Sequence, residues 1–330
     1  MSPSGTLISG NDLRTLGLDA LFQDLYASTR EALDEDIKSL FATVEAKTNE
    51  VKFAALFDSP VPQLWVPGDA MPFESTDSLT HTATVVRFAK GIPWETDDEE
   101  DDQLQAIPER VQDLSGEFAH LPIRAAVDLI TGTASLLSTV PTAYDGSALH
   151  ITSTRFGHSG GNTIDGSGTG SPTAFQTDFY SLKARHKAFK KHTASSEPLW
   201  TGGGLDDHRN YLLVGSAEAA VEQNMASAFK AQITIDITGV AGASNVLAGN
   251  QPRTKNWSRL SGSDWFGFYT GAASKKPFLM AERHPAPIQV DFNETQGSDW
   301  AKEYRRRGAG WLQRLAFALF SPETTVKVNN

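Results

Sequence analysis

The sequence predicts an α+β fold, in which helices and strands are mixed without a regular βαβ rhythm. Apolar residues recur at spacings of three and four in an N-terminal segment and in a longer segment after Asp98, which is typical of amphipathic helices. Later segments are short and alternate in polarity or are rich in aromatic and β-branched residues, which favours strands. The 330 residues suffice for about two domains, each with a buried core.

The composition excludes several classes of function. Asp and Glu outnumber Lys and Arg by 40 to 29, and the formal net charge of −11 argues against a sequence-specific DNA-binding surface. The chain has no cysteine, which excludes disulfides, thiol catalysis and cysteine-ligated zinc or iron–sulfur sites. Because no long apolar window and no signal-peptide pattern are present, we expect a protein that is made in the cytoplasm, is soluble there and enters no membrane.

The first predicted element is an amphipathic helix or a broken pair of helices. Its apolar positions are Leu18, Leu21, Phe22, Leu25, Leu33, Ile37, Leu40 and Phe41. Three adjacent acids, Asp34, Glu35 and Asp36, point in different directions around a helix. We therefore interpret them as a solvated face and not as a metal site.

Residues 53–94 predict an extended β-hairpin. Prolines punctuate its first half, and residues 80–89 then alternate and are rich in β-branched side chains. Such a hairpin has few large apolar residues for its length, so it cannot form a core alone. We expect it to lie on its own body or on a neighbouring subunit.

Residues 95–102 contain seven acids in eight positions. They lack the spaced ligands and the central glycine of a calcium loop, whereas acids at a helix start complement the positive end of the helix dipole. A helical pattern follows, and we expect one long bent helix or two helices over residues 98–131. Pro108 fits a first turn or a bend, and Pro122 should kink or break the helix.

The second half of the chain predicts shorter elements. We expect a strand at residues 148–156 and a mobile glycine-rich loop at residues 157–170. Two helices follow, at residues 175–192 and 216–229. Strands or short apolar segments are expected at residues 211–214, 232–238, 265–269, 278–280, 311–320 and 324–328.

One motif suggests catalysis. The run Gly157-His158-Ser159-Gly160-Gly161 fits the G-x-S-x-G nucleophile elbow, and a predicted strand precedes it. Glycines follow the serine where an elbow needs a helix, and Asp206, Asp207 and His208 supply the residue types of a triad without a reason for its geometry. A serine hydrolase that uses Ser159 is therefore kept as the alternative function.

The remaining patterns predict no cofactor and no metal site. The glycine runs at residues 166–170 and 202–204 lack the spacing of phosphate loops, and the eight histidines are scattered. Two basic segments, residues 183–191 and 305–307, suit a contact with phosphates, a solvated face or pairing with the acidic run of another copy. We name no catalytic, cofactor-binding or metal-ligating residue.

Several weak features occur in one order along most of the chain. An N-terminal arm and a long hairpin come first, followed by a long helix with an acidic entry at residues 100–104 and a Tyr-Asp-Gly turn at residues 144–146. A Leu-Leu-Val strand then runs into a helix at residues 211–225, and an aromatic strand precedes Lys276-Pro277. The pattern closes with Tyr304, three arginines, glycine and Trp311. Together they resemble the Mu-type phage major head subunit family. The sequence departs from it before the hairpin, where only Leu64-Trp65 stands in place of a longer aromatic and basic stretch.

The resemblance implies the Hong Kong 97-type major capsid fold. Residues 1–52 would be an N-terminal arm, and residues 53–97 an extended β-hairpin loop. Residues 98–205 would hold the spine helix and the first part of the peripheral domain. Residues 206–270 would form the axial domain, and residues 271–330 would return to the peripheral domain and the C-terminal strands.

The function that the resemblance implies is structural and not enzymatic. The chain would assemble with itself, as pentamers and hexamers, into the icosahedral shell of a virion, after synthesis in the host cytoplasm. Portal, scaffold and decoration proteins would be further partners, and packaged DNA would be met by proximity without sequence specificity. A monomeric binding module is a third class of function.

Overall fold

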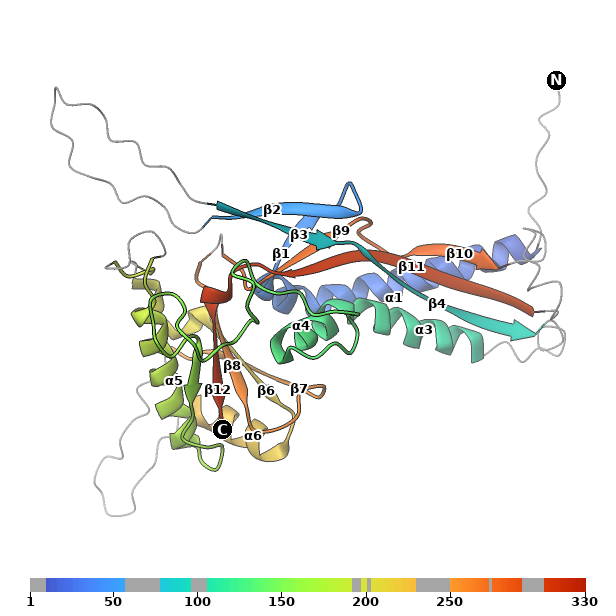
Figure 1. Cartoon of the computed structure of the whole chain (residues 1–330). Coiled ribbons are helices and arrows are strands. Elements are labelled where there is room, and N and C mark those ends of the chain that lie inside the picture. Colours follow the sequence, from blue (N-terminus) through green and yellow to red (C-terminus); the bar gives the residue numbers. More distant parts are fainter. Residues whose placement is uncertain are drawn as a thin grey trace, which may run out of the picture.

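The computed structural model describes residues 10–56, 78–95, 106–191, 197–200, 203–229, 250–272, 275–292 and 306–330, which form two lobes (Figure 1). The first lobe is elongated, with a five-stranded sheet and three helices along one face. The second lobe holds another five-stranded sheet with two helices. The α+β prediction is confirmed.

The sheet of the first lobe is centred on one long strand. Its elements are α1 (Gly10–Leu40), α3 (Ala106–Ala119), α4 (Leu121–Thr131), β1 (Phe41–Glu45), β4 (Val86–Glu95), β9 (Phe278–Glu282), β10 (Ile288–Phe292) and β11 (Arg306–Leu319). Strand β11 pairs antiparallel with β4 along one edge and with β10 and β9 along the other. Strand β1 joins β9 in parallel, so residues 41–45 and residues 278–319 contribute strands to one sheet.

The predicted helices of this lobe are confirmed, with one correction. Helix α1 is a single helix of 31 residues, but Phe41, which we assigned to its apolar stripe, is the first residue of β1. Of the two alternatives for residues 98–131, one long bent helix or two helices, the structure has two, α3 and α4. Pro122 lies in the first turn of α4, where its missing N–H breaks no helical bond, and Gly132 ends α4 with a φ of 70°. Residues 96–105 lie outside the described ranges.

Aromatic stacking holds the helices on the sheet. The ring of Phe22 on α1 stacks on Trp311 of β11, with ring centroids 4.3 Å apart. Phe118 of α3 contacts the ring of Phe22 edge-on, with centroids 5.8 Å apart. Trp311 is buried, and its indole N–H donates to Asp19 Oδ1 at 3.0 Å. One cluster therefore ties α1, α3 and β11 together.

The predicted hairpin is confirmed for part of its length. Strands β2 (Glu50–Leu56) and β3 (Ser78–Thr84) pair antiparallel, and their base lies on the outer face of the sheet through Val51, Phe53 and the buried Ala83. Strand β4 follows β3 directly but pairs with β11 over ten residues instead of extending the hairpin. The described part of the hairpin packs on this sheet, in agreement with the expectation that it lies on its own body or on a neighbouring subunit.

The second lobe carries its sheet between helices and loops. Its elements are β5 (Thr163–Asp165), α5 (Pro172–Ala188), β6 (Tyr211–Ser216), α6 (Ala219–Phe229), β7 (Arg253–Trp257), β8 (Trp265–Tyr269) and β12 (Thr325–Asn329). The strand order is β5-β12-β8-β6-β7. Every residue of β6 and β8 is buried, which explains why their continuous apolar runs predicted strands. Residues 230–249, with the strand expected at 232–238, lie outside the described ranges.

The strand predicted at residues 148–156 is wrong. The buried Asn162 replaces a strand partner, because its Oδ1 accepts from Ile151 N at 3.0 Å and its Nδ2 donates to Leu149 O at 2.8 Å. Arg155, also buried, donates to the carbonyls of Ala148 and Leu149 at 3.0 and 2.7 Å. Two polar side chains thus satisfy a segment that alternates like a strand.

Ion pairs connect the two lobes. Glu35 of α1 binds Arg253 of β7 at 2.6 Å, and Asp36 binds Lys255 at 3.0 Å. Asp36 is only 9% exposed, so our interpretation of it as part of a solvated face is wrong. Its partner comes from a strand far along the chain, which the local pattern of the helix does not reveal.

Truncating Phe22 tests the importance of the aromatic cluster. Phe22→Ala removes a fully buried ring, so we expect it to lower the free energy of unfolding by about 3–5 kcal/mol, measured by guanidinium unfolding. The matched control is Tyr180→Ala, an aromatic residue on a helix that is 47% exposed and should cost much less. Equal losses in the two variants would contradict this account.

Candidate functional site

The serine motif does not form a nucleophile elbow. Ser159 is exposed, and turns and then strand β5 follow it where an elbow requires a helix. Gly157 and Gly161 have φ values of 69° and 55°, so the glycines serve left-handed turns. In the described part of the chain, no hydrogen bond joins Ser159 to a histidine or a carboxylate.

The residues proposed as triad partners lie on the other side of α5. Arg185 binds the motif through the carbonyls of Gly160 and Gly161, at 2.6 and 2.8 Å. Lys183 and Lys187 instead contact His208 and Asp206, at 2.8 and 2.6 Å. On a helix, position 185 is rotated by about 200° from both 183 and 187. Asp206 and His208 are therefore not brought to Ser159.

The basic segment on α5 is occupied within the chain. Arg185 also donates to the carbonyl of Thr163 at 2.9 Å, and Lys191 pairs with Glu197 at 3.3 Å. These contacts fix the glycine-rich loop, which argues against the mobility that its composition predicted. Of the cations that we considered for phosphates or for the acidic run of another copy, Lys183, Arg185, Lys187 and Lys191 thus have partners within the chain. Arg305 of the second basic segment lies outside the described ranges.

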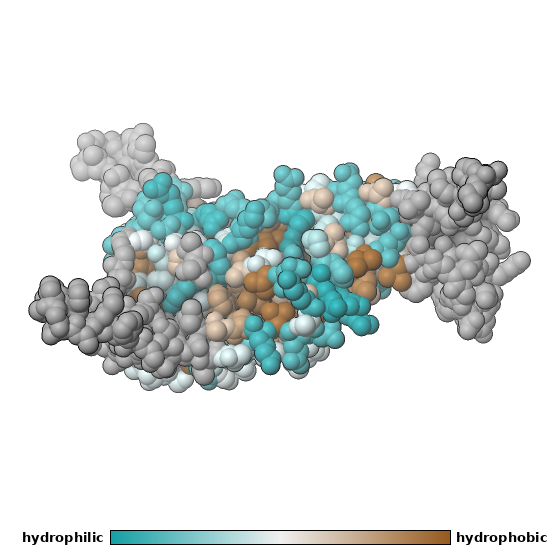
Figure 2. Space-filling view, turned by 90° about the horizontal axis from the view of Figure 1, so that it is seen from above, coloured by the Kyte–Doolittle hydropathy of each residue, from teal (hydrophilic) through white to brown (hydrophobic). Residues whose placement is uncertain are grey.

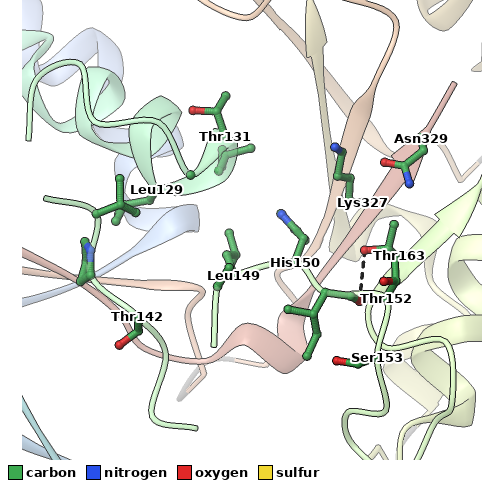
Figure 3. Close-up of a pocket in the computed structure, with 16 residues that line it drawn as sticks. Leu129, Thr131, Thr142, Leu149, His150, Thr152, Ser153, Thr163, Lys327 and Asn329 are labelled. Carbon is green, nitrogen blue, oxygen red and sulfur yellow. Dashed lines mark hydrogen bonds between the residues drawn. The ribbon is translucent and has the colours of Figure 1, made fainter. Parts of the chain in front are cut away.

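A cavity of about 610 Å³ lies where the two lobes meet. Across it, Leu129 and Thr131 at the end of α4 face the loop residue His150 and Lys327 of strand β12 (Figure 3). None of the described residues that line it is acidic, and Lys327 pairs with Asp264 at 2.7 Å. Burial, reinforced by the charge of Lys327, lowers the pKa of His150 to about 3, so the ring is neutral.

A second buried histidine lies inside the second lobe. His186 is fully buried, and its ring meets Phe189 and Tyr211 with centroids 5.6 and 5.8 Å apart. Burial lowers the pKa of His186 to about 4. A neutral imidazole in an aromatic core is a structural residue and not a proton donor at neutral pH.

Of the five large apolar side chains that are exposed among the described residues, four lie on the sheet of the first lobe: Val44, Val86, Ile288 and Val290. On its outer face, Ile288 of β10 lies in one row with Leu312 and Ala89, and Val290 lies in the next row. Ile288 and Val290 are 43% and 39% exposed. Seen from above, apolar side chains gather in patches among hydrophilic ones on this face (Figure 2). Exposed apolar patches of this kind are typical of protein–protein contacts.

Two further findings concern metals and membranes. Within the described ranges, no three His, Asp or Glu side chains come together as a metal site would require. Among the helices described, none is long and apolar enough to cross a membrane.

Comparison with known proteins shows the fold. No protein-family model and no curated protein matches the chain. Three solved structures with 10% sequence identity are similar to it. The match to Mycobacterium phage Patience has a TM-score of 0.52 and covers 100% of this chain and 94% of that chain. The match to the capsid of an empty GTA particle (TM-score 0.52) covers 88% of each chain, and the match to the bacteriophage PhiM1 mature capsid (TM-score 0.51) covers 88% of this chain and 84% of that chain. The chain has the Hong Kong 97-type fold of phage capsid proteins, which confirms the predicted fold.

Gly161 should be irreplaceable in the motif for structural reasons. A Cβ at this position would lie 2.1 Å from the carbonyl oxygen of Ile151, and its φ is left-handed. We expect Gly161→Ala to lower the free energy of unfolding by ~2 kcal/mol or more, measured by thermal or denaturant unfolding. Gly168→Ala is the control, because Gly168 is also left-handed (φ 96°) but a Cβ there meets nothing within 4 Å. A larger loss at Gly168 would contradict the clash.

His186 should make the protein sensitive to acid. Its folded pKa is lowered, so the unfolded chain binds the proton more tightly, and stability is complete above about pH 6.5 and falls as the pH drops towards 4. At pH 5 the loss is about 2 kcal/mol. We expect His186→Phe to weaken this dependence in unfolding measurements between pH 7 and 5, and substitution of the exposed His120 by Gln to leave it unchanged. Identical pH dependence in all three proteins would rule out this role.

Proposed function

We propose that the chain is a structural major capsid protein that assembles with itself into a closed icosahedral shell of pentamers and hexamers around phage DNA. The observation that carries this proposal is the Hong Kong 97-type fold, matched over 88–100% of the chain by phage and particle capsid structures. Its location would be the virion, after assembly in the host cytoplasm.

The hairpin and the sheet provide physical support. Strands β2 and β3 project from the body, and the side chains by which the described residues pack on the sheet lie at the base of the hairpin. The outer face of the sheet exposes Ile288 and Val290. A shell of identical subunits supplies neighbours for both surfaces.

The proposal assigns roles to the five parts of the chain. Residues 1–52 are proposed as the N-terminal arm and residues 53–97 as the extended loop. Within these segments α1, β1 and β4 pack on their own subunit, and the hairpin is the part proposed to lie over a neighbouring subunit. Residues 98–205 contribute the spine helix, for which α3 and α4 are the candidates, and residues 271–330 complete the peripheral domain. Residues 206–270 belong to the axial domain, which shares its sheet with β5 and β12.

The finer assignments rest on the sequence resemblance. It places the chain near the Mu-type major head subunits and adds portal, scaffold and decoration proteins as partners. The net charge of −11 suits DNA that is enclosed without sequence-specific binding, because a strongly cationic lining would hold it. The serine hydrolase alternative has no support from the geometry of Ser159, and the proposal contains no catalytic step.

Shortening the hairpin tests the proposal. Replacing residues 60–75 by a Gly-Ser turn leaves β2 and β3 in place, so the subunit should fold with unchanged circular dichroism. We expect the unmodified chain to form closed particles in light scattering and negative-stain imaging, and the shortened chain to lose them.

Two results would count against it. Closed particles from the shortened chain would contradict the role of the extended loop. A chain that stays monomeric over a wide range of salt and concentration would overturn the capsid assignment and favour a binding module.

A further inference from the structure

The cavity where the two lobes meet, which we call the interlobe cavity, is large enough for a small molecule. Its volume of about 610 Å³ is that of an ordinary ligand pocket. The end of α4 lies on one side of it, and residues 148–153 and strand β12 face that end (Figure 3). A molecule held there contacts both lobes.

Two basic side chains converge in the interlobe cavity. The ring of His150 lies against Phe266 with centroids 5.4 Å apart, and the ammonium of Lys327 lies 6.0 Å from the centre of the same ring. The ion-pair partner of Lys327, Asp264, is not among the residues that line the cavity. Because the described lining contains no acid, the formal charge that it presents to an occupant is positive.

His150 is a buried polar group without a hydrogen bond of normal geometry. Both ring nitrogens are covered, and neither is bonded to a described residue. The carbonyl of Ile130, in the last turn of α4, is near enough to favour a protonated ring. Burial, together with the charges of Lys327 and Arg155, outweighs this effect and lowers the pKa of His150 to about 3. The ring is therefore neutral where one more negative charge nearby would favour its cation.

The rest of the lining combines hydroxyl groups with apolar surface. Thr142, Thr152 and Ser153 are exposed, and their hydroxyls make no hydrogen bond to other described residues. Hydroxyls and an ammonium donate to the oxygens of phosphate- and sulfate-type anions. Leu129 and Val140 add apolar surface on which an organic group packs.

We propose that the interlobe cavity binds a doubly charged tetrahedral anion, either free or as the phosphoryl end of a small organic phosphate, on Lys327 and the neighbouring hydroxyls. The anion offsets the charge of Lys327 beside His150, so the imidazole takes up one proton from solvent when the anion binds. Binding therefore becomes tighter as the pH falls, by at most tenfold per pH unit. The occupant joins α4 to β12 and stiffens the connection between the lobes. This inference does not rest on the proposed function.

Isothermal titration calorimetry of the complete chain with sodium sulfate tests the proposal. Sulfate keeps its double charge throughout the pH range used, and the ionic strength is held constant with sodium chloride. We expect saturable binding at one site per chain, with an affinity that rises at least threefold per pH unit between pH 7 and 5.5. His150→Phe keeps a ring beside Phe266 and should remove this pH dependence without abolishing binding.

Substitutions in the lining locate the site. Lys327→Met should weaken sulfate binding at least tenfold, whereas Lys191→Met should leave it unchanged. Lys191 is the matched control because it also pairs with a partly exposed acid, Glu197, but does not line the cavity. Thr142→Asp, at an exposed position, should abolish binding by charge repulsion, and Thr142→Asn is its neutral control. Circular dichroism checks that each variant is folded.

A comparison of phenyl phosphate with inorganic phosphate at pH 7.5 distinguishes the two sources of the anion. The apolar part of the lining predicts that phenyl phosphate binds at least tenfold more tightly, which assigns the site to small organic phosphates. Equal affinities assign it to the free anion.

Three results would overturn the proposal. The first is the absence of saturable binding of sulfate and of both phosphates. The second is a pH dependence that His150→Phe leaves unchanged, and the third is an equal loss of affinity in Lys191→Met and Lys327→Met. Each of these results leaves the capsid assignment standing, because none of the measurements depends on assembly.

Discussion

The pairing of β11 along both of its edges is the constraint on which the first lobe depends. A strand of 14 residues buried in a sheet must satisfy its N–H and C=O groups on both sides, and β4, β9 and β10 supply the partners. The stack of Phe22 on Trp311 then fixes α1 to the same strand. The hairpin leaves the body where β3 passes into β4, so its direction also follows from β11.

Outside the two sheets, polar side chains supply the hydrogen bonds and ion pairs that hold the loops and connect the lobes. Asn162 and Arg155 satisfy the backbone between the lobes, and Arg185 holds the glycine-rich turns. Glu35 and Asp36 bind the edge strand β7. Such contacts are satisfied within the chain and leave only a few surfaces for partners. The outer face of the first lobe's sheet, with the exposed Ile288 and Val290, is one of these.

The sequence was most informative where local pattern and burial coincide. Helices α1, α5 and α6 and the buried strands β6 and β8 follow from periodicity, because one face or all of each element is apolar. The edge strands β7 and β10 were missed, since they are short and partly exposed and lack a continuous apolar run. The segment 148–156 was misread because Asn162 replaces a strand partner. The cavity where the two lobes meet combines residues of α4, of the loop around His150 and of β12, which no local pattern brings together.

The parallel pairing of β1 with β9 has a consequence for synthesis of the protein. Phe41 pairs with Phe278, and β4 pairs with β11 near the C-terminus, so the ribosome makes one side of the sheet long before the other. Until β9 and β11 emerge, α1 and β4 have no sheet to join, and the first lobe cannot close. Truncated chains released early would therefore lack the body that carries the hairpin. The order of the strands thus delays closure of the first lobe until β11, which ends at Leu319, has been made.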